Sequence, residues 1–200
     1  QERLDRQDLA AARSARAAAD PRVALALYEK LAARGGAVAE NALYEMGGIY
    51  HDQLKQPGKA VAAWDRYRTR YPNGLLRAEA DLSVIDTLVS LGDGKRTLGE
   101  SLAFLKRYPH SERRGEVARV VGDLYRGDGN CAAAVEFYRV AQGAKVTHDD
   151  ADDASFGQAA CLYAMRDDGA SSALRAYLDQ NPRGRHAHDA SRLLGDKQAP

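Results

Sequence analysis

ALYEMGGIY at residues 42–50 and AVAAWDRY at residues 60–67 are the two segments that decide the fold. Both carry small and aromatic residues at the offsets of three and four positions that a packed helix face requires, and QPG at residues 56–58 marks a turn between them. The residues on the two faces are Met46, Gly47 and Tyr50, then Ala60, Trp64 and Tyr67. Two helical patterns of similar length around one turn signal predict an antiparallel helical hairpin.

The hairpin pattern returns along the chain at a regular interval. RYP occurs twice, and its prolines, Pro72 and Pro109, lie 37 residues apart. Gly35 and Val146 stand one further interval before and after them, each just past a segment with the same alanine and aromatic pattern. Such self-similarity indicates a repeat protein, in which each hairpin buries its apolar face against the next.

The spacing within each unit is distinctive. A small residue stands three positions before a tyrosine in the first helix, an alanine precedes an aromatic residue by four positions in the second, and a proline follows. This pattern resembles the tetratricopeptide repeat over about four and a half units and nearly the whole chain. The resemblance implies an all-α, right-handed superhelical solenoid of antiparallel helix pairs with a C-terminal capping helix. It is weakest where Thr97 and Ser101 stand, so we expect looser packing there.

The length suits one domain with a continuous core, and we expect a single tetratricopeptide-like domain over residues 1–200. The interval of 37 residues exceeds the roughly 34 of the family, which indicates slightly longer helices or turns. The expected units are residues 3–36, 37–73, 74–110, 111–147 and 148–182, followed by a closing helix at residues 183–195.

Composition and charge argue against nucleic-acid and membrane partners. Lys and Arg total 29 against 28 Asp and Glu, a net charge of +1, so no overall field recruits nucleic acid or an anionic membrane. Local basic edges at residues 66–70 and 106–114 keep nucleic-acid binding as a less favoured alternative. No apolar run approaches the roughly 18 residues of a membrane span, so we expect a soluble segment without direct membrane insertion.

No residue pattern predicts catalysis, a cofactor or a metal. HDDADD at residues 148–153 offers ligands for a divalent cation but lacks the Gly and final Glu of a calcium loop, and acidic residues entering a helix cap its free amides. His186 and His188 lie two positions apart, on different sides of a helix, so we expect no shared metal. GDGKRT at residues 92–97 lacks the first glycine of a phosphate loop and follows a helix. We therefore predict a protein that is not an enzyme, with no cofactor and no metal.

The two cysteines, Cys131 and Cys161, fall in adjacent units. The repeat alignment places the first at a helix start and the second in the middle of the groove face. We therefore expect two free thiols and no disulfide.

The family resemblance also implies a groove lined by residues of the first helices. The side chains that project there are Asn41, Tyr44, His51, Glu79, Asp86, Arg119, Asp123 and Arg126. A polar surface with one aromatic ring and two arginines suits an extended peptide or a partner helix that carries carboxylates. Solvated helix faces have the same composition, so the alternative is a face without a partner. The Lys and Asn pattern with which some family members bind a terminal carboxylate is missing from the matching positions.

These observations favour a non-catalytic protein–protein interaction scaffold. Units that end in YP and continue as GLLRAEA or HSERR also resemble repeats of bacterial cell-envelope proteins, such as outer-membrane assembly lipoproteins and coordinators of wall synthesis. This second resemblance implies a periplasmic or envelope-associated protein, with a cytoplasmic one as the alternative. The chain begins at Gln1 without an initiator Met, which is compatible with a preceding signal, anchor or domain. The alternative function is therefore a regulatory or recruiting domain of a larger enzyme or signalling protein.

Overall fold

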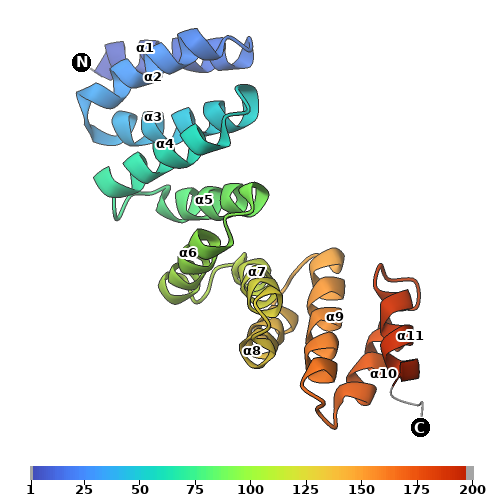
Figure 1. Cartoon of the computed structure of the whole chain (residues 1–200). Helices are drawn as coiled ribbons and strands as arrows, with labels where there is room; N and C mark the ends of the chain where they lie inside the picture. The colour runs from blue at the N-terminus through green and yellow to red at the C-terminus, as the bar shows by residue number, and fades with distance from the viewer. Residues whose placement is uncertain (1, 197–200) are drawn as a thin grey trace. The chain divides into compact units, whose positions relative to one another are not determined.

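Helices make up the architecture of residues 2–196, which the computed structural model describes (Figure 1). These residues form eleven α-helices and one short π-helix, and no strand occurs among them. The elements are α1 (Glu2–Ala17), α2 (Pro21–Arg34), α3 (Gly36–Gly48), η1 (Ile49–Gln53), α4 (Pro57–Arg70), α5 (Arg77–Leu91), α6 (Gly94–Arg107), α7 (Arg114–Gly127), α8 (Cys131–Gln142), α9 (His148–Ala164), α10 (Ala170–Gln180) and α11 (Ala187–Asp196). The predicted all-α fold of consecutive helix pairs is confirmed. None of the described helices is long and apolar enough to span a membrane.

The chain divides into two compact units, which we call the N-terminal unit (residues 1–100) and the C-terminal unit (residues 101–200). Each of the five expected repeat intervals contains one helix pair, from α1 and α2 to α9 and α10, and α11 occupies the position of the closing helix. The single domain expected over residues 1–200 stays a prediction, and its residues 1 and 197–200 lie outside the described part of the chain.

The division between the units falls inside α6, where the repeat pattern is weakest. Thr97 and Ser101 are buried in this helix. Thr97 Oγ1 donates a hydrogen bond to the carbonyl oxygen of Asp93 at 2.7 Å. A serine in place of an aromatic ring buries far less apolar surface than Trp64 does in α4. The looser packing expected here from the sequence stays a prediction.

Short polar residues and prolines set the helix starts. The side chain of Asp20 accepts a hydrogen bond from the amide of Val23 at 3.2 Å, and Pro21 occupies the first position of α2, where a missing N–H costs nothing. Asn130 caps α8 in the same way, through the amide of Ala133 at 3.2 Å. Such caps explain why the turn signals in the sequence place the helix boundaries so closely.

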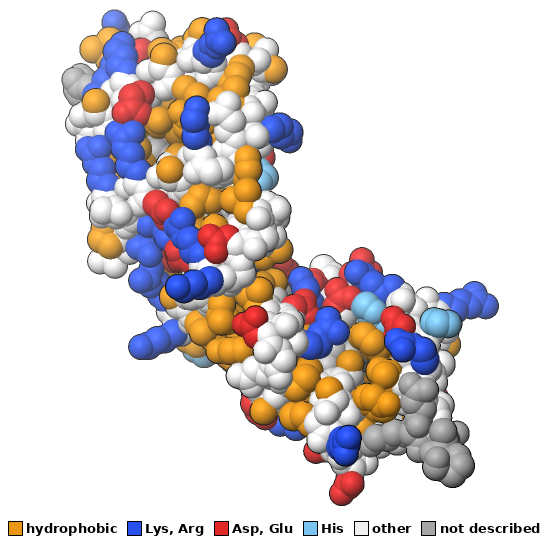
Figure 2. All heavy atoms as spheres, in the orientation of Figure 1, with side chains coloured by type: hydrophobic (Ala, Val, Ile, Leu, Met, Phe, Trp, Pro, Cys, Tyr) orange, Lys and Arg blue, Asp and Glu red, His pale blue; other side chains and the backbone are white. Residues whose placement is uncertain are grey.

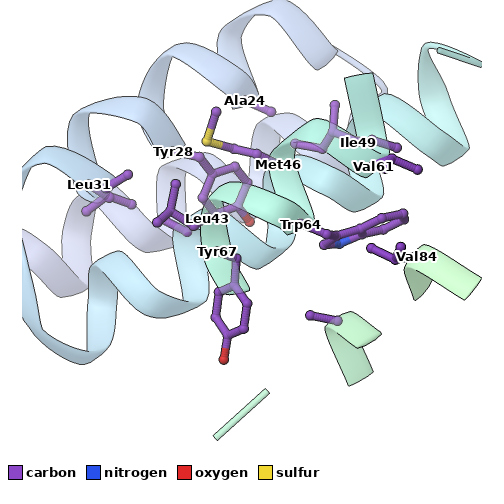
Figure 3. Packing of buried hydrophobic residues seen from close by; sticks show 14 of the residues in the cluster. Ala24, Tyr28, Leu31, Leu43, Met46, Ile49, Val61, Trp64, Tyr67 and Val84 are labelled. Carbon is purple, nitrogen blue, oxygen red and sulfur yellow. The ribbon is translucent and has the colours of Figure 1, made fainter. Parts of the chain in front are cut away.

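The core of the N-terminal unit consists of aromatic side chains packed on small residues. Figure 3 shows Trp64 and Tyr67 of α4 among the aliphatic side chains that surround them. Trp64 packs directly on Gly47 of α3, where a Cβ atom would overlap the indole ring. A glycine at this position therefore lets the two helices approach each other as closely as they do.

The π-helix η1 lengthens the second repeat by one residue. Gly47 and Trp64 are 17 positions apart, whereas the equivalent pair in the fourth repeat, Gly122 and Tyr138, is separated by 16. A turn with hydrogen bonds from residue i to i+5 accommodates one additional residue without ending the helix.

The C-terminal unit uses the same contact between glycine and an aromatic ring. Tyr138 of α8 is fully buried, and its ring lies against Gly122 of α7 and Gly157 of α9. A Cβ atom on Gly122 would lie 2.7 Å from Cε1 of Tyr138. One tyrosine thereby packs against both neighbouring helices at once.

Buried tyrosine hydroxyls join two of the helix pairs to the segments that follow them. The Tyr67 hydroxyl donates to Glu40 Oε1 at 2.8 Å and accepts a hydrogen bond from the amide of Leu76 at 3.0 Å. In the C-terminal unit, Tyr177 donates to Asp152 Oδ1 at 2.8 Å and accepts from the amide of His186 at 3.2 Å. Each hydroxyl thus connects the first helix, the second helix and the start of the next element.

A network of ion pairs crosses α4, α5 and α6 within the N-terminal unit. Arg68 contacts Asp65 at 2.7 Å, Asp81 at 3.0 Å and Glu100 at 2.7 Å. Arg77 makes a second contact with Asp81, at 3.0 Å. Acidic and basic side chains also adjoin one another on the face shown in Figure 2. The balanced composition therefore reflects charges that are paired locally.

Replacement of Gly47 by alanine tests the close approach of α3 and α4. Because the new methyl group would overlap Trp64, we expect Gly47→Ala to lower the free energy of unfolding by about 1–3 kcal/mol. Gly99→Ala in α6 is the matched control, since a Cβ atom there would meet no neighbouring group within 4 Å and alanine favours a helix by up to about 1 kcal/mol. Urea unfolding followed by the fluorescence of Trp64, the single tryptophan, measures both. Equal stability of the two variants would contradict the packing described.

The hydroxyl of Tyr177 predicts a loss of stability at alkaline pH. Burial, together with the nearby Asp152 carboxylate, raises the pKa of Tyr177 from its ordinary value of 10.0 to about 12. Because the folded pKa is the higher one, the hydroxyl stabilises the fold fully below about pH 10, and this contribution is lost as the pH rises through about 12. Tyr177→Phe should be less stable by about 1–3 kcal/mol at pH 7.

The difference in free energy of unfolding between the wild type and Tyr177→Phe should then shrink between about pH 10 and pH 12. Urea unfolding at several pH values measures it. A difference that stays constant from neutral to alkaline pH would show that the hydroxyl does not titrate as described.

Candidate functional site

Three of the residues predicted from the sequence line one cavity in the N-terminal unit. Tyr44 of α3, His51 of η1 and Asp86 of α5 border a space of about 290 Å³. The other residues around it are Arg16, Glu45, Gly48, Asp52, Trp64, Ser83 and Thr87. We call this space the α3–α5 cavity. The helical stripes predicted to face a groove therefore meet at one place.

The core fixes the aromatic wall of the α3–α5 cavity. Trp64 Nε1 donates a hydrogen bond to the carbonyl oxygen of Tyr44 at 3.2 Å. The ring of Tyr44 meets Tyr67 edge to face, with centroids 6.1 Å apart, and the His51 ring lies 6.0 Å from that of Trp64. Since Trp64 and Tyr67 are buried core residues, the wall is held in place without a ligand.

The π-helix places His51 and Asp52 at the rim of the cavity. His51 Nδ1 lies 2.8 Å from Asp52 Oδ1. Arg16 at the end of α1 pairs with Glu45, and its Nη2 lies 3.5 Å from Asp52 Oδ2. Gln53 Nε2 donates to the carbonyl oxygen of Arg16 at 2.7 Å, which ties η1 to α1. Sequence patterns did not indicate Arg16, Glu45 or Asp52, because these residues come from α1, α3 and η1 and only the packing of these elements brings them together.

The charges around the α3–α5 cavity are mainly negative. Glu45, Asp52 and Asp86 contribute three carboxylates, and Arg16 contributes one guanidinium group. Without Asp86, the two carboxylates of Glu45 and Asp52 still outnumber the one guanidinium group of Arg16. This balance differs from the arginine-rich surface that the sequence suggested for a partner with carboxylates.

Asn41 lines a second cavity, of about 400 Å³, between α1 and α3. Its other lining residues are Asp5, Arg6, Leu9, Ala37 and Val38. Asn41 and Tyr44 are three positions apart on α3, so both cavities lie along one face of this helix. Glu79 is exposed on α5 and lines neither of these two cavities.

In the C-terminal unit, Arg119 is engaged by carboxylates of its own chain. Its Nε lies 2.7 Å from Asp150 Oδ1, and its Nη1 contacts Asp123 and lies 4.0 Å from Asp153. Burial alone would lower the pKa of Arg119, but these carboxylates outweigh it and raise the pKa. These contacts hold α7 against α9 and leave Arg119 with little uncompensated charge.

The other two predicted residues of this unit lie beside Arg119. Asp123 Oδ1 accepts a hydrogen bond from the Tyr138 hydroxyl at 2.8 Å and so contributes to the core contact between α7 and α8. Arg126 is 40% exposed, and its Nη2 lies 3.9 Å from Asp123. Asp123 therefore takes part in the packing of α7 on α8, and Arg126 is more exposed than Arg119.

Comparison with known proteins agrees with these helix pairs. The sequence profile of the tetratricopeptide repeat family matches residues 41–74, the segment that contains Gly47 and Trp64. The fold is similar to a tetratricopeptide repeat protein from Parabacteroides merdae, with a TM-score of 0.69 and 14% identity over 96% of this chain and 73% of that one. Residues 41–74 therefore match a tetratricopeptide repeat, and the chain has the fold of tetratricopeptide repeat proteins.

Two structures of MamA also share the fold of this tetratricopeptide repeat protein. MamA from Desulfovibrio magneticus has a TM-score of 0.63 and 16% identity over 90% of this chain and 97% of that one. Another crystal structure of MamA has a TM-score of 0.67 and 14% identity, and the match covers 92% and 94% of the two chains. No curated protein matches the sequence. Similarity at these levels of identity establishes the fold alone.

The tetratricopeptide repeats bring Asp152, Asp153 and His186 together, with ligand atoms within 4.8 Å of one another. The sequence did not indicate this group, because the acidic run and the histidine lie in different helix pairs. His186 stacks on Phe156 at 4.4 Å, and its Nε2 lies 2.9 Å from Asp153 Oδ1. Arg185 Nη1 lies 3.5 Å from Asp153 and its Nε 3.8 Å from Asp152, so arginine already balances these carboxylates. The absence of a metal stays a prediction.

The packing of α8 on α9 brings the two cysteines into contact. The sequence pattern placed them apart, at a helix start and in the middle of a face. Both are free thiols in the structure, with Cys161 buried and Cys131 half-buried. Burial, with an added contribution from the Cys131 thiol, raises the pKa of Cys161 to about 12.

These environments predict unequal reactivity of the two thiols in this tetratricopeptide repeat protein. The thiolate is the reactive form, so Cys161 should be alkylated by iodoacetamide at pH 8 more than about tenfold more slowly than Cys131. In urea both should react at similar rates. Mass spectrometry of timed samples measures each site, and equal rates in the folded protein would contradict the burial of Cys161.

Proposed function

We propose that this tetratricopeptide repeat protein is a non-catalytic scaffold that binds an extended peptide or a helix of a partner protein along α1, α3 and α5. The observation that carries this proposal is the α3–α5 cavity, where Tyr44, His51 and Asp86 meet. Its aromatic wall is preformed by the core, so binding costs little ordering of the site.

The two cavities suit the dimensions of a peptide. Asn41 and Gly48, which line one cavity each, are seven positions apart on α3, or about 10 Å along the helix axis. A peptide in the extended polyproline II conformation advances about 3.1 Å per residue with three residues per turn, so side chains three residues apart point the same way at about this distance. Each cavity is large enough for one side chain, and the polar groups between them suit the backbone of a bound segment.

A protein partner is favoured over nucleic acid. The arginines at residues 66–70 that suggested a basic edge are engaged within the chain. Arg66 makes two hydrogen bonds with Glu29, at 2.8 and 2.9 Å, and Arg70 donates to the carbonyl oxygen of Ala32 at 2.9 Å. Cations held in this way contribute little to phosphate binding.

We also propose that the protein works in a bacterial cell envelope. The repeats that end in YP resemble those of envelope proteins, and structures similar to this fold come from bacteria. A cytoplasmic setting is the alternative.

A substitution that fills the α3–α5 cavity tests the proposed function. A library of random peptides displayed on phage is selected against the protein, and the selected peptides are measured by fluorescence anisotropy. Ser83→Trp places an indole in the cavity and should weaken peptide binding at least about tenfold through steric exclusion. Ser172→Trp, at an exposed position of α10 that lines neither of these two cavities, should leave the affinity unchanged.

Circular dichroism and thermal unfolding of both variants verify that the fold is retained. Peptides that bind the wild type and Ser83→Trp with equal affinity, or a selection that enriches no peptide, would contradict binding at this face.

A further inference from the structure

We infer that the α3–α5 cavity accepts a lysine or arginine side chain of the bound peptide, a conclusion that rests on the proposed function. The charges around the cavity support this assignment. Glu45 and Asp52 already outnumber Arg16, and Asp86 adds a carboxylate from α5. A partner carboxylate placed here would meet like charges, whereas a cation would find acceptors on both sides of the cavity.

The shape and chemistry of the wall also suit a long basic side chain. Tyr44, His51 and Trp64 present aromatic groups beside the carboxylates. Lysine and arginine bury their aliphatic stems against such groups and keep the charged end near acidic oxygens. Aromatic rings further attract a cation through their electron-rich faces. The volume of about 290 Å³ is small for a complete small-molecule ligand and adequate for one extended side chain.

Arg16 shows within the chain how this site accepts a guanidinium group. It enters from the end of α1, pairs with Glu45 and approaches Asp52 at 3.5 Å. Gly48 leaves room for it, since a Cβ atom there would lie 3.0 Å from Arg16 Nη2. A carboxylate offers about four lone-pair sites, so Asp52 retains acceptor capacity beyond its contacts with His51 and Arg16.

The inference changes the chemistry expected of the partner. The sequence suggested a partner with carboxylates because Arg119 and Arg126 fall on the predicted groove face. Arg119 is neutralised by Asp123, Asp150 and Asp153. The α3–α5 cavity, in the N-terminal unit, is bordered by three carboxylates and one guanidinium group.

A double-mutant cycle tests the inference. Peptides selected from the random library are resynthesised with each lysine or arginine replaced in turn by glutamine. We expect one replacement to weaken binding to the wild type about tenfold and to have little effect on a protein carrying Asp52→Asn and Asp86→Asn. Glu136→Gln combined with Asp179→Asn is the control for net charge, because it also removes two carboxylates, both exposed and outside the α3–α5 cavity. This control should behave as the wild type does.

The outcomes separate the inference from the proposed function. Selected peptides that lack lysine and arginine, or whose affinity is unchanged by Asp52→Asn and Asp86→Asn, would overturn the inference if Ser83→Trp still abolishes binding. The proposed function would then stand. Binding that survives Ser83→Trp would overturn both. An equal loss in the control with Glu136→Gln and Asp179→Asn would show that net charge, rather than this cavity, attracts the peptide, and would also overturn the inference.

Discussion

An aromatic ring packed on a bare glycine is the contact on which the rest of the structure depends. Trp64 lies against Gly47 in the N-terminal unit, and Tyr138 lies against Gly122 and Gly157 in the C-terminal unit. Without a Cβ atom, the first helix lets the ring of the second approach its backbone. The indole N–H of Trp64 then reaches the carbonyl oxygen of Tyr44, and this bond sets one wall of the candidate site. Core packing and the site therefore share the same residues.

Many charged side chains of this protein form ion pairs between its own helices. Arg68 draws on three carboxylates from α4, α5 and α6, and Arg119 on three from α7 and α9. Partly buried pairs of this kind hold helices in register, because removal of one partner leaves the other charged and desolvated. A net charge of +1 therefore says little about any one face. Recognition depends on the charges that remain uncompensated after these pairs are made.

The sequence predicted the helices and the helical faces well, for a physical reason. Prolines, glycines and capping residues such as Asp20 and Asn130 act locally, so the turns they specify are visible without a structure. The stripe with Asn41 and Tyr44 was expected from the family resemblance, which implies that this face of the first helix lines a groove. The inserted residue of η1 was not predicted, because hydrogen bonding from i to i+5 leaves no marked residue pattern. Arg16, Glu45 and Asp52 were missed because the contacts that join them run between α1, α3 and η1.

Contacts between repeats were the other part that the sequence did not reveal. Cys131 and Cys161 meet, as do Asp152, Asp153 and His186, because neighbouring helices bring them together at a crossing that one-dimensional spacing does not describe. This limit also explains the difference in predicted partner charge. A periodic pattern shows that Arg119 and Asp86 face outward from their helices, but the Coulomb energy of each depends on what lies within a few ångströms. Three carboxylates compensate the charge of Arg119, which falls on a predicted groove face. Around the cavity that Asp86 lines, carboxylates outnumber the one guanidinium group. The charge preferred in a partner therefore follows from the pairing of side chains across helices, and a residue's position on a helix face is not enough to infer it.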